Sequence, residues 1–348
     1  MRRSVAAAIA GAFIVALAGC SSTPTPESTG ASTAASDEEL VKLAQEEGQV
    51  VVYTGWRDDS IAAVKEAFQE KYGIEVVIEE RFSSADLAQR IDSDVRTDGR
   101  IDADWVLTTD QALATYLSEE GYTLPVSASD FPGLDEKFVD GEAAIECTVG
   151  VPVVGYNTDV LGDDVVIDSW DDLLDPSLSG HIMIADPRNS AAWANTWSSM
   201  YNSSQLGEDF ITTLGDQDYD PVASSLVGTE QLVAGQSGVL LFGIASLFEP
   251  AIEAGQPIKM WFPTDPSPVF FNFCMQTANS DHPNAGLLFF KWFMSEEGQN
   301  LVQGIERLAS PLGDLPDTIP LPDDLTLAPE PTQVQDELPD ILSLLGFS

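Results

Sequence analysis

The chain has 348 residues, and its 44% share of hydrophobic residues is ordinary for a globular protein. It carries 57 acidic and only 15 basic side chains, which gives a formal net charge of −42 at pH 7. A chain with so few basic residues lacks the clusters that neutralise phosphates, which excludes nucleic-acid binding. Its length exceeds what one hydrophobic core usually serves, which predicts two domains.

Two arginines, Arg2 and Arg3, precede an apolar run from Val5 to Leu17. The run is too short to span a bilayer and ends in small residues, which is typical of a secretory signal peptide over residues 1–19. The ending Leu17-Ala18-Gly19-Cys20 looks like a bacterial lipobox, in which the cysteine becomes the lipidated first residue of the mature protein. The alternative is an ordinary signal followed by a chance cysteine.

Residues 20–36 form a tract of Ser, Thr, Pro and Ala with almost no apolar content, which is typical of a disordered tether. No later apolar run reaches the ~18 residues needed to cross a bilayer. We therefore expect an exported protein that is attached to the outer face of the cell membrane only through a lipid on Cys20.

Helix and strand patterns alternate in the first part of the chain. Helices are predicted at 37–48, 59–73 and 83–99, and strands at 49–55, 74–81 and 101–109. This alternation indicates an α/β layer with a largely parallel sheet. Because ligands bind beyond the carboxyl ends of the strands in such sheets, the loops at 53–58, 81–84 and 107–110 are expected at one ligand-binding edge.

A long apolar run at 142–161, interrupted by Gly150, Pro152 and Gly155, predicts a strand that leaves the first domain and starts the second. Two repeats of helix and strand follow. The pattern then predicts two strands within 257–278 and one amphipathic helix at 282–303. The tail after residue 310 is rich in proline, which argues against long regular elements there.

Several segments, in their order and spacing, resemble the extracellular solute-binding lipoproteins of ABC importers, in the branch that includes ferric-ion-binding proteins: GQVVVYTG, DADWVLTTD, VGVPVVGYNTD, SWDDLLDPSLSGHIMIADPRNS and HPNAGLLFFKWFMSEEGQNLV. The resemblance implies the α/β, two-lobed type II periplasmic-binding-protein fold, with a mixed, mostly parallel sheet flanked by helices in each lobe and two hinge strands. Lobe one would comprise residues 37–147 and 273–348, with the end of the tail docked on it, and lobe two residues 148–272.

The same resemblance places Cys147 and Cys274 on neighbouring hinge strands, and so implies a disulfide between them. An exported protein permits such a bond. Two buried reduced thiols are the alternative.

Family members that bind bare iron hold it with two adjacent tyrosines, a histidine and a carboxylate. This chain has Ile244-Ala245-Ser246-Leu247 where the tyrosine pair is expected and Trp56-Arg57 where the histidine is expected. Its two histidines, His181 and His282, stand in positions that indicate structural or surface roles. No cysteine and histidine cluster has zinc spacing. We therefore expect neither a metal site nor a cofactor.

Arg57 and Arg188 each stand at the start of a predicted helix, where backbone N–H groups favour negative charge. One arginine from each lobe would clamp a carboxylate, phosphonate or phosphate as the lobes close. The alternative for Arg57 is a surface ion pair with Asp58 or Asp59, and for Arg188 a pair with Asp186.

Aromatic side chains near strand ends, Trp56, Trp193 and Trp261, are candidates for the pocket wall, although such residues are more often part of the core. Candidates for neutral hydrogen bonds, including the helix caps after Arg188, are Ser83, Ser84, Thr108, Thr109, Asn189, Ser190 and Ser246.

The sequence thus predicts a monomeric binding protein that captures a small anionic organic solute, such as a phosphonate, sugar phosphate or carboxylate, and delivers it to an ABC permease. Ferric iron held with a synergistic anion is the main alternative, and a polyamine the next. We do not expect an enzyme, because the chain has no Gly-x-Ser-x-Gly motif and no well-placed histidine.

Overall fold

The computed structural model describes residues 36–79, 82–264, 266–322, 325–326 and 330–347. The predicted signal peptide, Cys20 and all of the predicted tether except Ser36 lie outside these residues. Within them, no helix combines the length and the hydrophobicity that crossing a membrane requires.

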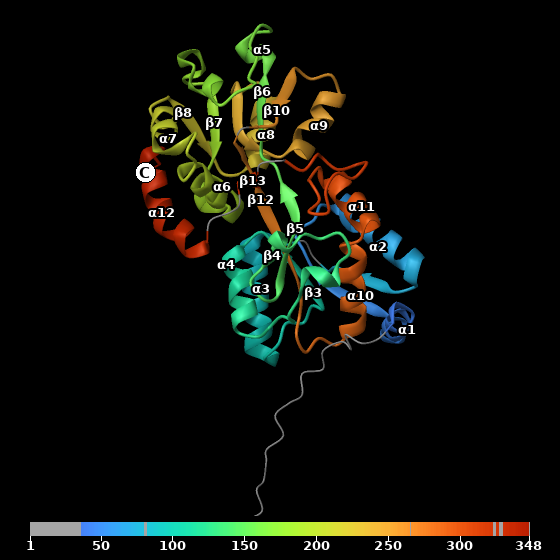
Figure 1. Ribbon diagram of the computed structural model, residues 1–348. Helices are drawn as coiled ribbons and strands as arrows, with labels where there is room; N and C mark the ends of the chain where they lie inside the picture. The colour runs from blue at the N-terminus through green and yellow to red at the C-terminus, as the bar shows by residue number, and fades with distance from the viewer. Residues whose placement is uncertain (1–35, 80–81, 265, 323–324, 327–329, 348) are drawn as a thin grey trace, which may run out of the picture.

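The chain forms two lobes, each built around its own sheet (Figure 1). The lobe-one sheet has the strand order β2 (Glu75–Val77), β1 (Gln49–Tyr53), β3 (Trp105–Thr108), β12 (Phe270–Gln276), β5 (Ala144–Gly150) and β4 (Val139–Asp140). The lobe-two sheet has the order β10 (Ile258–Trp261), β6 (Val153–Asn157), β9 (Val239–Gly243), β7 (Ile182–Ala185) and β8 (Tyr219–Val222). A two-stranded ribbon pairs β11 (Ser267–Pro268) with β13 (Leu325–Thr326).

Both sheets are mixed. Strands β2, β1 and β3 run parallel, as do β9, β7 and β8, whereas β12 and β6 run antiparallel to their neighbours. The carboxyl ends of the parallel strands in one sheet meet at one edge, and the next helix starts there. This topology directs helix starts from both lobes toward the space between them.

Helices cover both sheets. In lobe one they are α1 (Asp37–Glu47), α2 (Asp58–Tyr72), α3 (Ser84–Asp98), α4 (Gln111–Glu119), α10 (Pro283–Phe293) and α11 (Glu296–Glu306). In lobe two they are α5 (Thr158–Leu161), α6 (Ala191–Tyr201), α7 (Gly207–Gly215), α8 (Ser225–Val233), α9 (Ala245–Glu253) and α12 (Pro331–Leu344).

Local sequence signals explain most helix ends. Helix α1 begins after Ser36, whose side chain accepts a hydrogen bond from the Glu39 N–H, and it ends at Gly48 in the left-handed conformation. The single helix predicted over 282–303 is two helices, because Ser295 caps the N-terminus of α11 and separates it from α10.

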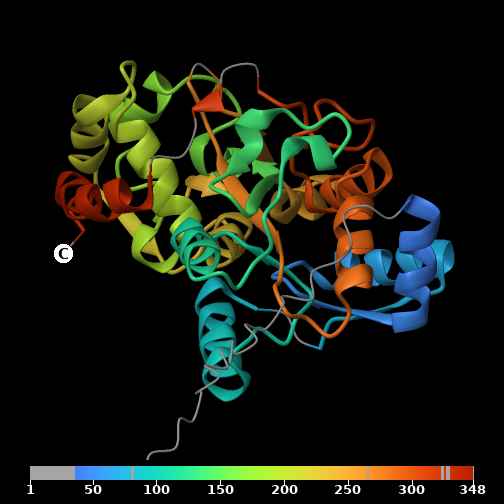
Figure 2. The ribbon, with the colours of Figure 1, turned by 60° about the horizontal axis from the view of Figure 1, so that its bottom comes forward.

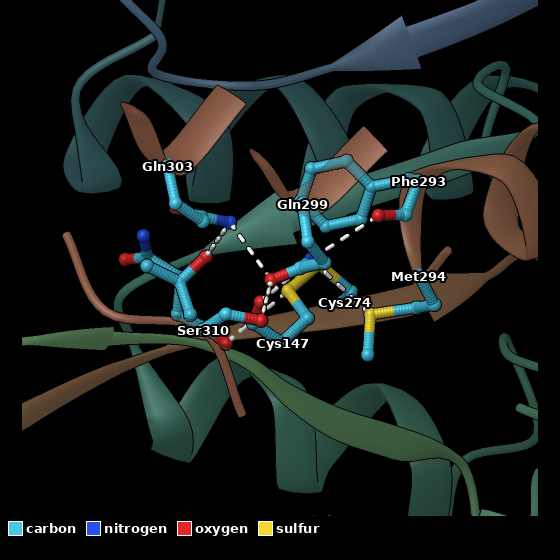
Figure 3. The surroundings of a disulfide bond; sticks show 9 residues. Cys147, Cys274, Phe293, Met294, Gln299, Gln303 and Ser310 are labelled. Atoms are coloured by element: carbon cyan, nitrogen blue, oxygen red, sulfur yellow. Dashed lines mark hydrogen bonds between the residues drawn. A yellow bond between two sulfur atoms is a disulfide. The ribbon is translucent and has the colours of Figure 1, made fainter. Parts of the chain in front are cut away.

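The hinge strands β5 and β12 pair with each other, and a disulfide joins Cys147 to Cys274 with their Cα atoms 5.8 Å apart (Figure 3). Buried glutamines of α11 hold β5. Gln299 donates to the Cys147 carbonyl (3.2 Å) and Gln303 donates to the Thr148 hydroxyl (2.9 Å). The junction of the lobes is therefore held by covalent and polar contacts as well as by apolar packing.

The C-terminal tail differs from the prediction. Pro331 is in the first turn of α12, where proline is tolerated, and Pro339 lies inside the helix. The helix packs on α6 and α7, and Ile341 and Leu345 belong to the lobe-two core (Figures 1 and 2). The expectation that the tail docks on lobe one is wrong, because the apolar side of this helix packs on α6 and α7 of lobe two.

Glu146 lies on β5 with only 8% of its surface exposed, and its Oε2 atom has no hydrogen-bond partner among the described residues. Burial raises the pKa of Glu146 to about 8, and the negative charge of nearby Asp140 adds to this shift. Burial also raises the pKa of Asp140, and the negative charge of Glu330 adds to this shift. The hinge strand therefore carries a carboxyl group that stays protonated near neutral pH.

Removing the disulfide by the double substitution Cys147→Ala and Cys274→Ala should lower the free energy of unfolding by roughly 2–5 kcal/mol, because the bond closes a long loop in the unfolded chain. The two cysteines are 127 residues apart, so the loop that this bond closes is long. Urea unfolding of the variant and of the oxidised wild type measures the difference, and equal midpoints would contradict the prediction.

The free energy of unfolding should fall as pH rises from about 5 to 8, because folded Glu146 keeps a proton that the unfolded side chain, with a pKa near 4.5, releases. In Glu146→Gln this fall should be smaller by on the order of a few kcal/mol. Urea unfolding of the wild type and of Glu146→Gln across this pH range measures both changes in the free energy of unfolding. Glu142→Gln, at an exposed position on the adjoining turn, is the control and should behave as the wild type does.

Candidate functional site

A cleft of about 830 Å³ lies between the two lobes, within the size range of small-molecule sites. We call it the interlobe cleft. The residues that line it come from both lobes and from β12: Gly55, Trp56, Arg57, Asp58, Asp59, Ser83, Ser84, Ala85, Leu107, Thr109, Asp186, Asn189, Ser190, Ala192, Trp193, Ala223, Ser224, Ser225, Leu226, Ile244, Ser246, Leu247, Phe270, Asn272, Glu306 and Leu308.

The lobe-one wall includes the segments that follow β1, β2 and β3, together with residues of β12 and the end of α11. Ser83 caps α3 by accepting a hydrogen bond from the Asp86 N–H (3.2 Å). The Ser84 and Thr109 hydroxyls are hydrogen-bonded to each other (2.7 Å), which ties the start of α3 to the loop after β3. The predicted edge of three loops therefore exists and faces the cleft.

The lobe-two wall consists of the starts of α6, α8 and α9, which follow β7, β8 and β9. Ser190 caps α6 by accepting from the Trp193 N–H (3.4 Å), and Ser224 caps α8 by accepting from the Val227 N–H (3.3 Å). Helix α9 differs, because its N-cap residue Ile244 has no side-chain oxygen and makes no capping bond. The first N–H groups of a helix lack acceptors within that helix, so the start of α9 is suited to an acceptor from a ligand.

The N-cap residue of α2, Arg57, also makes no side-chain cap, but carboxylates of the chain occupy this helix start. Glu306 accepts a hydrogen bond from the Arg57 N–H (3.1 Å), and Asp59 accepts one from the Ser60 N–H (3.0 Å). Glu306 also accepts from the Ser60 hydroxyl (2.5 Å). Among the helix starts at the cleft that the structure describes, α9 is thus distinguished from α2, α3, α6 and α8.

Arg57 lies at the cleft and pairs with Asp59, to which its Nε donates a hydrogen bond (3.1 Å). This hydrogen bond holds the pKa of Asp59 below its usual value. The ion pair considered as an alternative is therefore present, yet 29% of the Arg57 side chain stays accessible, and its position still allows contact with a solute.

Arg188 does not line the cleft, so the two-arginine clamp is not formed in this structure. Its guanidinium donates to both carboxylate oxygens of Asp186 (3.0 and 3.1 Å from Nε), and it lies over the Phe347 ring at 5.5 Å. The fork geometry of the ion pair and the attraction of a cation to an aromatic face keep this side chain at the C-terminal tail.

The tryptophans belong largely to the core. Trp56 and Trp193 border the cleft but are only 4% and 5% exposed. Trp56 packs between Trp105 and Phe293, whereas Trp193 stacks on Phe242 and meets the edge of Phe270. The third candidate, Trp261, packs on Trp170 and does not line the cleft.

Of the eleven ligand-binding candidates, Thr108 and Arg188 are absent from the described lining. Thr108 is buried at the end of β3, and its hydroxyl accepts a hydrogen bond from the Asp110 N–H (3.0 Å).

Sequence reasoning missed Ser224, Phe270, Asn272 and Glu306, all of which line the cleft. Ser224 follows a strand and caps a helix, which is the same pattern that predicts Ser190 at the cleft. Asn272 is a lone amide within the apolar segment FFNFC, which is a weaker signal. Glu306 reaches the cleft through the packing of α11 on α2, which no local pattern indicates.

The charges of the cleft are mixed. Four carboxylates line it (Asp58, Asp59, Asp186 and Glu306) against one guanidinium. Three of the four are engaged by donors of the chain, Asp59 by Arg57, Asp186 by Arg188 and Glu306 by Ser60. The described lining includes no tyrosine, histidine or cysteine, and no cluster of at least three His, Cys, Asp or Glu residues in the described chain is arranged to hold a metal ion.

Solved structures with the same fold bind different solutes. Iron-bound HitA from Pseudomonas aeruginosa is 21% identical, with 86% of this chain and 98% of that chain aligned and a TM-score of 0.67. AfuA from Actinobacillus pleuropneumoniae, solved with fructose-6-phosphate, is 18% identical over 86% and 99% of the chains, with a TM-score of 0.66. The spermidine/putrescine protein PotD from Streptococcus pneumoniae is 15% identical over 85% and 99%, with a TM-score of 0.64.

A curated relative, an uncharacterized protein of Haemophilus influenzae, is 24% identical over 279 residues, which cover 74% of this chain and 76% of the relative. The family of bacterial extracellular solute-binding proteins matches residues 63–324, more than half of the chain. The resemblance and the two-lobed fold predicted from the sequence are confirmed. The chain therefore belongs to the bacterial extracellular solute-binding proteins, which bind small solutes for ABC importers.

Proposed function

We propose that the chain captures a small anionic organic solute, such as a phosphonate, a sugar phosphate or a carboxylate, in the interlobe cleft and delivers it to an ABC permease. The observation that carries the proposal is the convergence of helix starts from both lobes on one cleft, with α9 uncapped. Elsewhere in this chain an uncapped helix start takes a carboxylate, since Glu47 accepts hydrogen bonds from the N–H groups of Asn284 and Ala285 at the start of α10.

Electrostatics favour an anion despite the carboxylates in the wall. Each helix start carries the equivalent of about +0.5 charge, so the five starts at the cleft supply about +2.5. Arg57 and Arg188 offset the charges of Asp59 and Asp186 by ion pairing, and Glu306 is engaged at the start of α2. An anion bound between helix starts of both lobes would also stabilise the closed arrangement, because its contacts are complete only when both walls reach it.

Two other solutes are the alternatives. Ferric iron is a hard cation that takes oxygen ligands, and HitA is one precedent in this fold. The lack of tyrosine and histidine in the described lining disfavours it here. A polyamine is the second alternative, and PotD is named for spermidine and putrescine. The four carboxylates of the wall are the observation that favours a polyamine here.

The role proposed for the chain is binding without turnover. We further propose that the mature protein is a monomer held on the outer face of the membrane by a lipid on Cys20, with residues 20–36 as the tether. Export is consistent with the family of the chain.

The substitution Ser246→Asp tests the sign of the solute. Asp is favourable in the first turn of a helix, so α9 should remain folded. The added charge should weaken binding of an anion at least about tenfold and strengthen binding of a cation. Isothermal titration with sugar phosphates, phosphonates, citrate with and without Fe(III), and putrescine measures both, with Ser246→Asn as the uncharged control of similar size.

A solute that binds the Asp variant more tightly than the Asn variant would contradict the anionic proposal and favour the polyamine. Retention of Fe(III) by the wild type in the absence of any organic anion would favour iron instead.

A further inference from the structure

The central residue of this inference is Asn272, which lies on hinge strand β12 and lines the interlobe cleft. Its backbone is held firmly, because Asn272 pairs with Thr148 of β5 and is two residues from the disulfide at Cys274. The register of the strand pair shifts between Asn272 and Phe273, which is a local irregularity of the kind that re-aims side chains.

The Asn272 side chain is 7% exposed, and its Oδ1 atom has no hydrogen-bond partner within the described part of the chain. Buried carbonyl oxygens are nearly always paired, and an unpaired one costs stability. Asn272 lines the cleft, but its Oδ1 atom has less than 1 Å² of accessible surface in this structure, so a donor of the solute would reach this unpaired acceptor as the amide turns toward the cleft.

The surroundings of Asn272 restrict the kind of solute. Phe270, on the same strand, lies over Gly150, where any side chain would overlap its ring. Trp193 meets the edge of Phe270, and Leu308 completes an apolar part of the cleft wall. The hinge side of the cleft thus offers one amide acceptor within an apolar surface, which fits a carbon chain that carries an O–H or N–H group.

We propose that Asn272 determines specificity by accepting a hydrogen bond from a hydroxyl or amino group of the solute. This inference rests on the proposed function and deepens it. The solute would be an organic anion whose charge is held at the helix starts and whose carbon skeleton carries at least one hydrogen-bond donor. Hydroxylated phosphates and hydroxy acids belong to this class, whereas simple alkyl phosphates and unsubstituted carboxylates do not.

The test compares glycerol 3-phosphate with propyl phosphate, which have the same charged group and differ in their hydroxyls. We expect the wild type to prefer glycerol 3-phosphate at least about tenfold, and Asn272→Leu to reduce this preference to about twofold or less. Asn272→Asp, which keeps an acceptor, should retain the preference. Because both probes carry the same charge, the repulsion that Asp adds cancels in the ratio of dissociation constants.

A second readout needs no solute. Since Asn272→Leu removes an unpaired buried acceptor, the melting temperature of the unliganded variant should rise, by about 2–4 °C. An asparagine whose Oδ1 atom is paired within the fold would give a fall instead, so this readout tests the premise that the acceptor is unpaired. Asn272→Leu with an unchanged preference for glycerol 3-phosphate, or with a lowered melting temperature, would overturn the inference.

Failure of both phosphates to bind the wild type would overturn the phosphate form of the proposed function. The same comparison of a hydroxy acid with its unsubstituted carboxylate, lactate with propionate, in the wild type and in Asn272→Leu would then decide the inference about Asn272 separately.

Discussion

The pairing of β5 with β12 is the constraint on which the arrangement of the cleft depends. These two strands belong to the lobe-one sheet, and the segments next to them lead into lobe two. The disulfide between Cys147 and Cys274 fixes the strands to each other, and the glutamine contacts from α11 fix β5 to that helix. Because the connection is held so firmly at one place, the walls that each lobe presents lie opposite each other, and a solute can contact both.

The chemistry of the cleft follows from topology more than from any single residue. Parallel strands bring their carboxyl ends to one edge, and the helices that follow begin there with their N–H groups directed outward. Serines satisfy part of each start at α3, α6 and α8, whereas the chain's own carboxylates occupy α2. What remains for a solute is the uncapped start of α9, the partly accessible Arg57 and the polar groups between them. In the proposed site, backbone dipoles would recognise the charge of the solute, so the preference of the site is hard to recognise in a sequence.

The sequence predicted the parts of the site that depend on local patterns. A strand followed by a polar turn and a helix placed Trp56, Ser84 and Ser190 at the cleft, because such junctions lie at the sheet edge in any fold of this class. Arg188 has the same local pattern, but its guanidinium lies at Phe347, far away in the sequence. Asn272 and Glu306 enter the cleft through strand pairing and helix packing, which join distant segments. The helical tail was also missed, because two prolines obscured a pattern in which Val334, Ile341 and Leu345 share one buried side.

The position of α12 has a consequence for motion. Since the chain reaches lobe one again in α10 and α11 and then ends on lobe two, the polypeptide passes between the lobes three times. The third passage runs through β13, which pairs with β11 in the segment that precedes β12. Two adjacent strands alone would let one lobe both bend and swivel about the other. A third connection, paired through β13 with the segment that leads into β12, opposes the swivel and leaves bending as the easier motion, so the two lobes would meet in the same alignment at each closure.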